Sequence, residues 1–167
     1  MAEFIKQQDT RRTFIDTLVE LAEKDDKIVL IVPDVGFYYI DEFQNRFPNR
    51  FFNFGVTETS TVLIASALAL DGWKPYVYSM INFVLFRPYE AVRNGVVNHK
   101  ANVKLIGVKG STGYKFLGFS HNLSSEDEDI KVCENLGLEW VICNSPEDVS
   151  ACIKTTHEMQ QSFYIRL

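Results

Sequence analysis

Residues 50–72 read RFFNFGVTETSTVLIASALALDG, and this stretch decides the fold. Its phenylalanine-rich start, which ends at Gly55, is typical of a short strand buried in a parallel sheet. Over residues 62–70 almost every position is Ala, Leu, Ile or Val. This composition predicts a helix that is apolar on all sides, buried in the domain or at a subunit interface, and ended by Gly72.

Glu58 is the carboxylate at the junction between this strand and this helix. It falls in the first turn of the predicted helix and at the carboxyl end of the predicted strand, where open α/β sheets place their ligands. Glu58 is therefore a candidate for chemistry. The alternative is that it only complements the helix dipole, an effect of up to about 1 kcal/mol. Thr57 precedes it and is expected to cap the helix.

The composition limits the class of protein. With 167 residues, of which 46% are hydrophobic and 23% charged, the chain fits one globular domain with a core. Its net charge of −5 argues against nucleic acid as the main partner. No segment approaches the roughly 20 apolar residues of a membrane span, and the N-terminus lacks the apolar core of a signal peptide, so we expect a cytoplasmic protein. The cysteine and histidine spacings offer no metal site within this chain.

Apolar runs of strand length alternate with helical patterns along the chain. Further helices are predicted over residues 11–24, 38–47, 82–98, 125–136 and 146–156, and further strands over residues 28–33, 75–79, 103–109, 140–143 and 163–167. Ser145 is expected to cap the last of these helices. With the central stretch, these elements predict one α/β domain over residues 1–167, built on a six-stranded, mainly parallel sheet with helices on both faces.

Two segments lack a simple pattern. Residues 110–125 carry three glycines and no clear periodicity, so we expect a long loop that is functional or mobile. The acidic run over residues 126–129 is interpreted as a solvated face of a helix that Ser125 and Glu128 open as a capping box. The chain has neither a GxGxxG nor a GxxxxGKS/T motif, so function is expected at the strand ends rather than in a nucleotide-binding loop.

Residues 52–58, FNFGVTE, resemble the strand-to-helix junction in the pyrimidine-binding domain of thiamine diphosphate enzymes of the transketolase group. The runs NFVLFRPYEAVRN, NVKLIG, GFSH and the terminal YIRL follow in the same order as in the carboxy-terminal section of split, two-subunit transketolases. The resemblance covers nearly the whole chain. It implies a thiamine diphosphate-binding fold of the pyrimidine type and a transketolase-like transferase.

For Glu58 the resemblance implies a catalytic role. In the family this glutamate hydrogen-bonds N1′ of the aminopyrimidine and thereby promotes loss of the proton on C2 of the thiazolium. A carboxyl group between an aromatic strand and an apolar helix is expected to be desolvated, which favours sharing a proton with N1′. Phe83 matches the aromatic residue that stacks on the pyrimidine, and Met80 takes the place of a second aromatic. Phe86 is either part of this cofactor-binding pocket or ordinary core.

Three further positions match the family's site. His121 in GFSH resembles the histidine that reaches the substrate's hydroxyl groups near C2 of the cofactor; its alternative is an exposed loop side chain. Asp34 matches an aspartate close to the thiazolium ring. Arg11, or Arg12 if the alignment shifts by one residue, matches a phosphate-binding arginine of the substrate site.

Two features depart from the family pattern. Transketolases usually carry an acidic residue just before the glycine of a DGxSH or DGxTH motif, and Leu117, preceded by Phe116, takes that place here. This replacement argues against a usual sugar-phosphate substrate. The sequence also stops where the family's carboxy-terminal section continues into a third domain, so we expect a pyrimidine domain alone. Arg87 and Glu90 in the RPYE run are interpreted as helix-packing or interface residues.

The chain has no GDG motif, which the family uses to hold the diphosphate and Mg²⁺. The resemblance therefore implies a separate diphosphate-binding subunit, thiamine diphosphate shared across the interface, Mg²⁺ held by that partner, and an α2β2 assembly. Three interpretations follow. The first is a subunit of a transketolase-like enzyme that moves a two-carbon ketol unit from a ketose. The second is a subunit of a split 2-oxo acid decarboxylase or carboligase, and the third is a non-catalytic oligomerisation module.

Overall fold

Six strands form one sheet in the order β2-β1-β3-β4-β6-β5. The structure is a computed structural model that describes the backbone of residues 2–110 and 112–167 and the side chains of residues 10–110 and 115–167. Every neighbouring pair is parallel. The strands are β1 (Ile28–Val32), β2 (Phe51–Asn53), β3 (Lys74–Met80), β4 (Lys104–Val108), β5 (Trp140–Ile142) and β6 (Phe163–Arg166). This arrangement confirms the predicted fold class, although β2 is shorter than expected.

The strand order reverses direction between β1 and β3. From β1 the chain passes to β2 at one edge of the sheet, then returns to β3 on the other side of β1 and continues to β4. At such a switch point the connections leaving the carboxyl ends of two neighbouring strands diverge, and a crevice opens between them. The candidate site is therefore expected beside the ends of β1 and β3.

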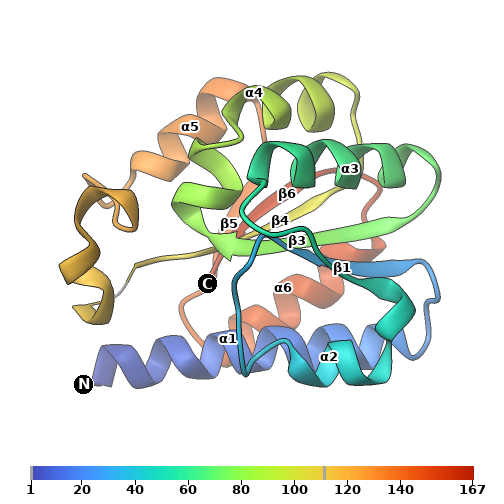
Figure 1. Cartoon of the computed structure of the whole chain (residues 1–167), viewed down its shortest axis with the longest axis horizontal. Helices are drawn as coiled ribbons and strands as arrows, with labels where there is room; N and C mark the ends of the chain where they lie inside the picture. The colour runs from blue at the N-terminus through green and yellow to red at the C-terminus, as the bar shows by residue number, and fades with distance from the viewer. Residues whose placement is uncertain (1, 111) are drawn as a thin grey trace.

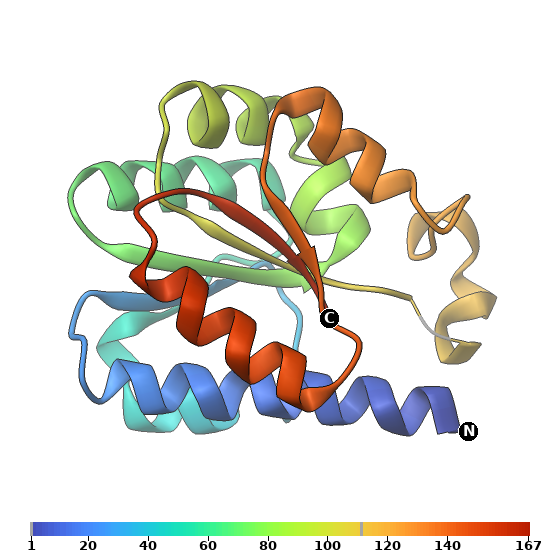
Figure 2. The same ribbon diagram turned by 180° about the vertical axis from the view of Figure 1, so that it is seen from behind.

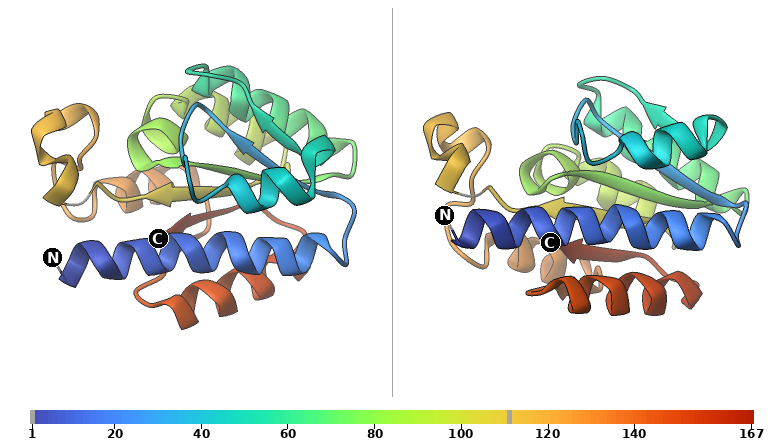
Figure 3. Two further views of the ribbon diagram at one scale, coloured as in Figure 1. Left: turned by 60° about the horizontal axis from the view of Figure 1, so that its bottom comes forward. Right: turned by 90° about the horizontal axis from the view of Figure 1, so that it is seen from below.

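Helices cover both faces of the sheet (Figure 1). On one face lie α1 (Ala2–Ala22), α2 (Asp41–Arg46) and α6 (Pro146–Glu158), and on the other α3 (Glu58–Leu70), α4 (Tyr89–Ala91) and α5 (Glu128–Leu136). The reverse view places α6 next to α1 (Figure 2), and the views from below show these two helices side by side under the sheet (Figure 3). The α1 helix begins well before the predicted residue 11.

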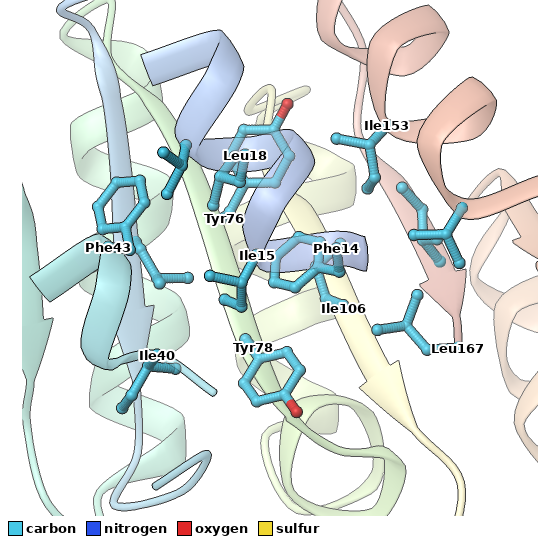
Figure 4. Packing of buried hydrophobic residues seen from close by; sticks show 14 of the residues in the cluster. Phe14, Ile15, Leu18, Ile40, Phe43, Tyr76, Tyr78, Ile106, Ile153 and Leu167 are labelled. Carbon is cyan, nitrogen blue, oxygen red and sulfur yellow. The ribbon is translucent and has the colours of Figure 1, made fainter. Parts of the chain in front are cut away.

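One of the two hydrophobic cores among the described residues lies between the sheet and the helices α1, α2 and α6. In Figure 4, Phe14, Ile15 and Leu18 of α1 meet Tyr76 and Tyr78 of β3. The ring of Phe14 stacks on that of Tyr78, with centroids 5.5 Å apart and planes at 9°. Because full burial of a large apolar side chain contributes about 1.5–3 kcal/mol, this layer fixes α1 against the strand whose end borders the site.

The α3 helix is covered on one side. Val62 and Ala65 are buried against the sheet, whereas Leu63, Ile64 and Leu70 are 45%, 38% and 60% exposed. The described part of this chain thus leaves one apolar side of the helix open, which is typical of an interaction surface.

No helix among the described residues is long and apolar enough to cross a lipid bilayer.

The prediction of a single regular helix over residues 82–98 is wrong in detail. A π-helical turn, η2 (Asn82–Phe86), precedes α4, and a second π-helical segment, η3 (Val92–Asn98), follows it. Pro88 has no N–H for the preceding turn, and the N–H of Arg87 donates to a carbonyl five residues back at 2.8 Å. Wide turns of this kind often occur at functional sites, because they change which side chains share a face.

Residues 110–125 are more regular than the sequence predicted. A 3₁₀ helix, η4 (Thr112–Ser120), occupies much of this stretch and breaks at Gly118, where φ is 61°. The segment extends from the carboxyl end of β4 to one side of the molecule (Figures 1 to 3). Asn82 ties it to η2, because its Nδ2 donates to the carbonyls of Phe119 and Asn122 at 3.3 and 3.4 Å.

Of the three predicted helix caps, one is confirmed. The Ser145 hydroxyl accepts the N–H three residues on at 3.1 Å and caps α6. Thr57 does not cap α3 with its side chain, because its hydroxyl donates to a carbonyl three residues back at 2.9 Å. Ser125 does not cap α5 either. That helix begins only at Glu128, and the Ser125 hydroxyl donates to the carboxylate of Asp127.

The acidic run over residues 126–129 is not solvated throughout, which corrects the interpretation from sequence. Asp129 is fully buried. Its carboxylate accepts a hydrogen bond from the Tyr164 hydroxyl at 2.6 Å and from Arg166 Nη1 at 2.9 Å. Burying a carboxylate is costly unless it is paired and hydrogen-bonded, and these two bonds make Asp129 a structural residue that joins α5 to β6.

Candidate functional site

A pocket of about 650 Å³ lies at the carboxyl ends of β1, β3 and β4, at the switch point of the sheet. Its wall is mostly apolar and aromatic, and charged groups enter it at a few places. The lining residues are Arg11, Pro33, Asp34, Val35, Gly36, Phe37, Tyr38, Tyr39, Val56, Glu58, Tyr78, Met80, Phe83, Arg87, Val108, Leu117 and His121. The structure therefore brings together at one pocket Arg11, Asp34, Glu58, Met80, Phe83 and His121, whose roles in the site remain predictions.

The turn after β1 forms one wall. At Gly36 φ is +91°, and a Cβ atom there would lie 2.8 Å from a ring carbon of Tyr78, so this position requires glycine. Asp34 has a φ of 54°, and its N–H donates to Asn53 Oδ1 at 3.1 Å. This bond ties the ends of β1 and β2 together and leaves the exposed Asp34 side chain at the pocket.

Glu58 is the first residue of α3 and is only 5% exposed. Its carboxylate forms an ion pair with the guanidinium of Arg87, whose side chain is 46% exposed. A buried carboxylate is costly unless a cation or a hydrogen-bond donor compensates it, so Arg87 is what makes the burial of Glu58 possible in this chain. The sequence interpretation of Arg87 as a helix-packing residue missed this contact.

Phe83, in η2, presents its ring to the same space. The guanidinium carbon of Arg87 lies 4.3 Å from the ring centroid, and the His121 imidazole meets the ring edge-on with centroids 4.9 Å apart. Through Arg87 the Phe83 ring is linked to the buried Glu58 carboxylate, and through His121 it is linked to the end of the η4 segment. A flat, nitrogen-containing ring is the kind of ligand that an aromatic face next to a carboxylate recognises.

Met80 and Phe86 have different positions relative to the pocket. Met80, the last residue of β3, is buried and lines the wall. Phe86 is packed instead against the core cluster on the α3 side of the sheet, and it is absent from the lining among the described residues. Of the two sequence interpretations of Phe86, this placement favours ordinary core.

His121 lies just after η4. Its Nδ1 is 2.7 Å from the Ser120 hydroxyl, and the half-buried ring borders the pocket with Leu117. Leu117 thus places an apolar side chain where the family resemblance leads one to expect a carboxylate. Phe116 is 82% exposed and is not among the described lining residues.

Arg11 and Arg12 both approach the ring of Tyr39, at 5.7 and 5.6 Å from its centroid. Arg11 lines the pocket. Arg12 is exposed and donates to the backbone carbonyl of Tyr38 at 3.1 Å. The structure therefore favours Arg11 over Arg12 as the arginine of the site.

Sequence reasoning also missed the aromatic residues 37–39, which line the pocket directly after β1. Phe37 and Tyr38 are 60% and 83% exposed. A run of three aromatic residues after a predicted strand and a Gly turn was the available signal, since large exposed apolar side chains at a strand end are typical of a binding surface.

Among the described side chains, no group of three His, Cys, Asp or Glu residues could hold a metal ion.

The parallel sheet and the pocket at its switch point define an α/β domain with a ligand site at the strand ends, and the family of this domain is known. The chain belongs to the transketolase pyrimidine binding domain family, whose model matches residues 6–167. This match confirms the resemblance found in the sequence.

Two named relatives show the range of the family. One of the subunits of the apulose-4-phosphate transketolase from Phocaeicola vulgatus is 30% identical over 159 residues, which are 94% of this chain and 50% of that relative. A 1-deoxy-D-xylulose-5-phosphate synthase from Clostridium perfringens is 36% identical over 97 residues, which are 56% of this chain and 15% of the synthase. The chain thus spans about half the length of the transketolase subunit that it matches.

A solved structure also matches this chain and is from the same family of enzymes. A split gene transketolase, described as an inactive β4 tetramer, matches this fold with a TM-score of 0.82 and 28% identity, over 95% of this chain and 50% of that one. The chain is therefore a transketolase-like pyrimidine domain with relatives among split transketolase subunits.

Proposed function

We propose that this chain is the pyrimidine-binding subunit of a heteromeric, thiamine diphosphate-dependent transketolase that transfers a two-carbon ketol unit. The observation that carries the proposal is the buried carboxylate of Glu58 in a pocket that the ring of Phe83 also lines. In this proposal residues 1–167 form one pyrimidine-binding domain, and the active site is completed by a second subunit.

The residues present fit the pyrimidine half of the cofactor. Phe83 offers an aromatic face, Met80 an apolar wall, and Glu58 the carboxylate for N1′. Asp34 lies at the pocket near the proposed thiazolium position. When bound, thiamine diphosphate supplies the carbon nucleophile of the reaction.

The protein side of the chemistry follows from these positions. Glu58 holds the proton shared with N1′, and its burial in an apolar site strengthens that hydrogen bond. His121 orients the hydroxyl groups of the substrate from the η4 side, and Arg11 of α1 binds an anionic group of the substrate. Met80 and Leu117 exclude water from the reacting atoms.

The partner in this proposal is a diphosphate-binding subunit that holds Mg²⁺ and the diphosphate. The exposed apolar residues Leu63, Ile64 and Leu70 on α3 provide a surface for such a subunit or for a second copy of this chain. The Phocaeicola vulgatus relative is itself named as one subunit of a transketolase, which supports an enzyme of more than one component. An α2β2 assembly in the cytoplasm is the arrangement that we propose.

Calorimetry tests the proposal. Thiamine diphosphate with Mg²⁺ is titrated into this chain alone and into its mixture with the product of the neighbouring gene, which is the candidate diphosphate-binding subunit. We expect tight binding only in the mixture. Absence of binding in a mixture that forms a stable complex would contradict the cofactor role and favour a non-catalytic oligomerisation module.

A second candidate activity is decarboxylation or carboligation of a 2-oxo acid. The apolar Leu117 at the pocket favours it, because a polyhydroxylated sugar leaves hydroxyl groups unpaired against such a wall. Glu58 has the same task in both reactions. Assays of the assembled complex with ketose donors and with 2-oxo acids separate the two, since each proposal expects turnover of its own donor class.

A further inference from the structure

The guanidinium of Arg87 makes both contacts that the proposed site offers to an aminopyrimidine. It forms the ion pair with the Glu58 carboxylate, and its central carbon lies 4.3 Å from the centroid of the Phe83 ring. We propose that Arg87 closes the pyrimidine site in the cofactor-free chain and that the cofactor binds by displacing it. This inference rests on the proposed function and concerns how that same site is regulated.

The chemistry of the two groups is similar. A guanidinium is flat, stacks on aromatic faces and directs N–H donors in its plane at a carboxylate. An aminopyrimidine is also flat and also presents nitrogen atoms at its edge. Arg87 and the cofactor ring therefore compete for the same two partners, the Glu58 carboxylate and the Phe83 ring.

The burial of the two partners is unequal, which suits a displaceable contact. Glu58 is 5% exposed and keeps its place in the first turn of α3. The Arg87 side chain is 46% exposed, so it can turn into solvent without leaving a buried charge of its own. Displacement then requires only that the incoming ring compensate the Glu58 carboxylate.

The backbone at Arg87 also favours a side chain that covers the pocket. Arg87 follows the π-helical turn η2 and precedes Pro88, and its N–H bonds to the carbonyl of Asn82 at 2.8 Å. The wide turn places Phe83 and Arg87, four residues apart, with one side chain over the other. The closing group and the stacking face thus belong to the same short segment.

When part of the molecules is closed, the apparent affinity for the cofactor equals the affinity of the open state multiplied by the fraction of open molecules. If Arg87 occupies the site in about four fifths of the molecules or more, its removal should tighten binding about fivefold or more, because nearly all molecules are then open. A residue that binds the cofactor directly has the opposite effect when it is removed. The sign of the change therefore identifies the role of Arg87.

The test is the affinity of Arg87→Met for thiamine diphosphate with Mg²⁺ in the complex with the diphosphate-binding subunit, measured by calorimetry without substrate. Arg93→Met is the matched control, because Arg93 is an exposed arginine of η3 whose side chain donates to Asn94 Oδ1 at 3.3 Å. We expect tighter binding by Arg87→Met and a change below about twofold in the control. Unchanged or weaker binding by a folded Arg87→Met overturns the inference.

A second measurement uses the wild-type chain and does not depend on the folding of a variant. The ¹⁵N resonance of the Arg87 side chain is followed by NMR while the complex is titrated with cofactor. We expect it to move to the position of a solvent-exposed arginine, and a resonance that stays unchanged at saturation overturns the inference. If the wild-type complex binds no cofactor, both this inference and the proposed function fail. If it binds while Arg87→Met gains no affinity, this inference alone fails.

Discussion

The imidazole of His121 meets the ring of Phe83 edge-on, with centroids 4.9 Å apart and planes at 90°. The two residues belong to segments that follow different strands, β3 and β4. The contact joins η2, which carries the proposed stacking face, to η4, which carries the proposed substrate side. The proposed cofactor side and the proposed substrate side of the pocket are therefore joined by one aromatic contact.

His121→Ala should weaken substrate recognition more than cofactor binding. The imidazole reaches the pocket from the η4 side, whereas the Phe83 face and the Glu58 carboxylate remain in place. We expect kcat/KM of the assembled enzyme to fall about 10- to 100-fold, in the range of one lost polar contact to the transition state. Thiamine diphosphate affinity should change less than about threefold.

Steady-state kinetics and calorimetry on the same preparation measure the two effects. His99→Ala is the control, since His99 is exposed beyond the end of η3. Equal losses in both quantities for His121→Ala would contradict a substrate role.

Glu58→Gln should abolish most of the turnover. The amide keeps the shape of the side chain but cannot share a proton with N1′, so the loss of transition-state stabilisation should be roughly 3 kcal/mol or more, about 100-fold in kcat. Single-turnover kinetics in the complex measure it. Glu134→Gln is the control, because Glu134 is an exposed carboxylate of α5 that is not among the described lining residues. Full activity of Glu58→Gln would exclude the catalytic role.

Asp129→Asn should lower stability without any direct effect on the pocket. Asp129 is fully buried and accepts from Tyr164 and Arg166. Removing the charge leaves the buried guanidinium of Arg166 with only the exposed Glu126 carboxylate, 4.0 Å away, as an ionic partner, and breaking a buried pair in this way costs about 3–5 kcal/mol. Urea denaturation measures the loss. The control Asp127→Asn removes an exposed i,i+4 pair with Lys131, which water screens, so the urea midpoint should stay nearly unchanged.

The stability of the chain should decrease between pH 7.5 and pH 5.5 because of His157. Burial and the nearby Lys74 lower the pKa of this imidazole, although Asp25 opposes the shift. Its Nε2 lies 3.2 Å from Asp25 Oδ2, and its Nδ1 lies 3.2 Å from the Tyr76 hydroxyl. The unfolded chain then binds a proton at higher pH than the folded one, so stability is present above about pH 6.5 and is lost as the pH falls toward the lower folded pKa.

Urea midpoints across this range measure the effect. His157→Gln should flatten the pH dependence, and the exposed His99→Gln should leave it intact. Burial lowers the pKa of the neighbouring Lys104 to about 8, so that group changes charge above the range tested. An unaltered slope in His157→Gln would assign the pH dependence to other groups.

Local sequence was sufficient for the strands and for one helix start. The apolar run over residues 28–33 and the Ser145 cap were predicted correctly, because a continuous apolar run and a Ser-Pro pair act through neighbours in the chain. The caps predicted at Thr57 and Ser125 were wrong. Their hydroxyls found other local partners, a competition that the residue type alone does not decide.

The sequence by itself determined the α/β class, the position of Glu58 at a strand-to-helix junction and the family resemblance, since periodicity and motif order are properties of the chain. Tertiary structure alone decided that Arg87 pairs with Glu58, that Phe86 is packed in the core and that Asp129 is buried beside Arg166. Each of these contacts joins residues that are far apart in sequence, and the strand order brings them together. Tertiary packing decides which distant side chain compensates a buried charge, so a local sequence pattern cannot predict it.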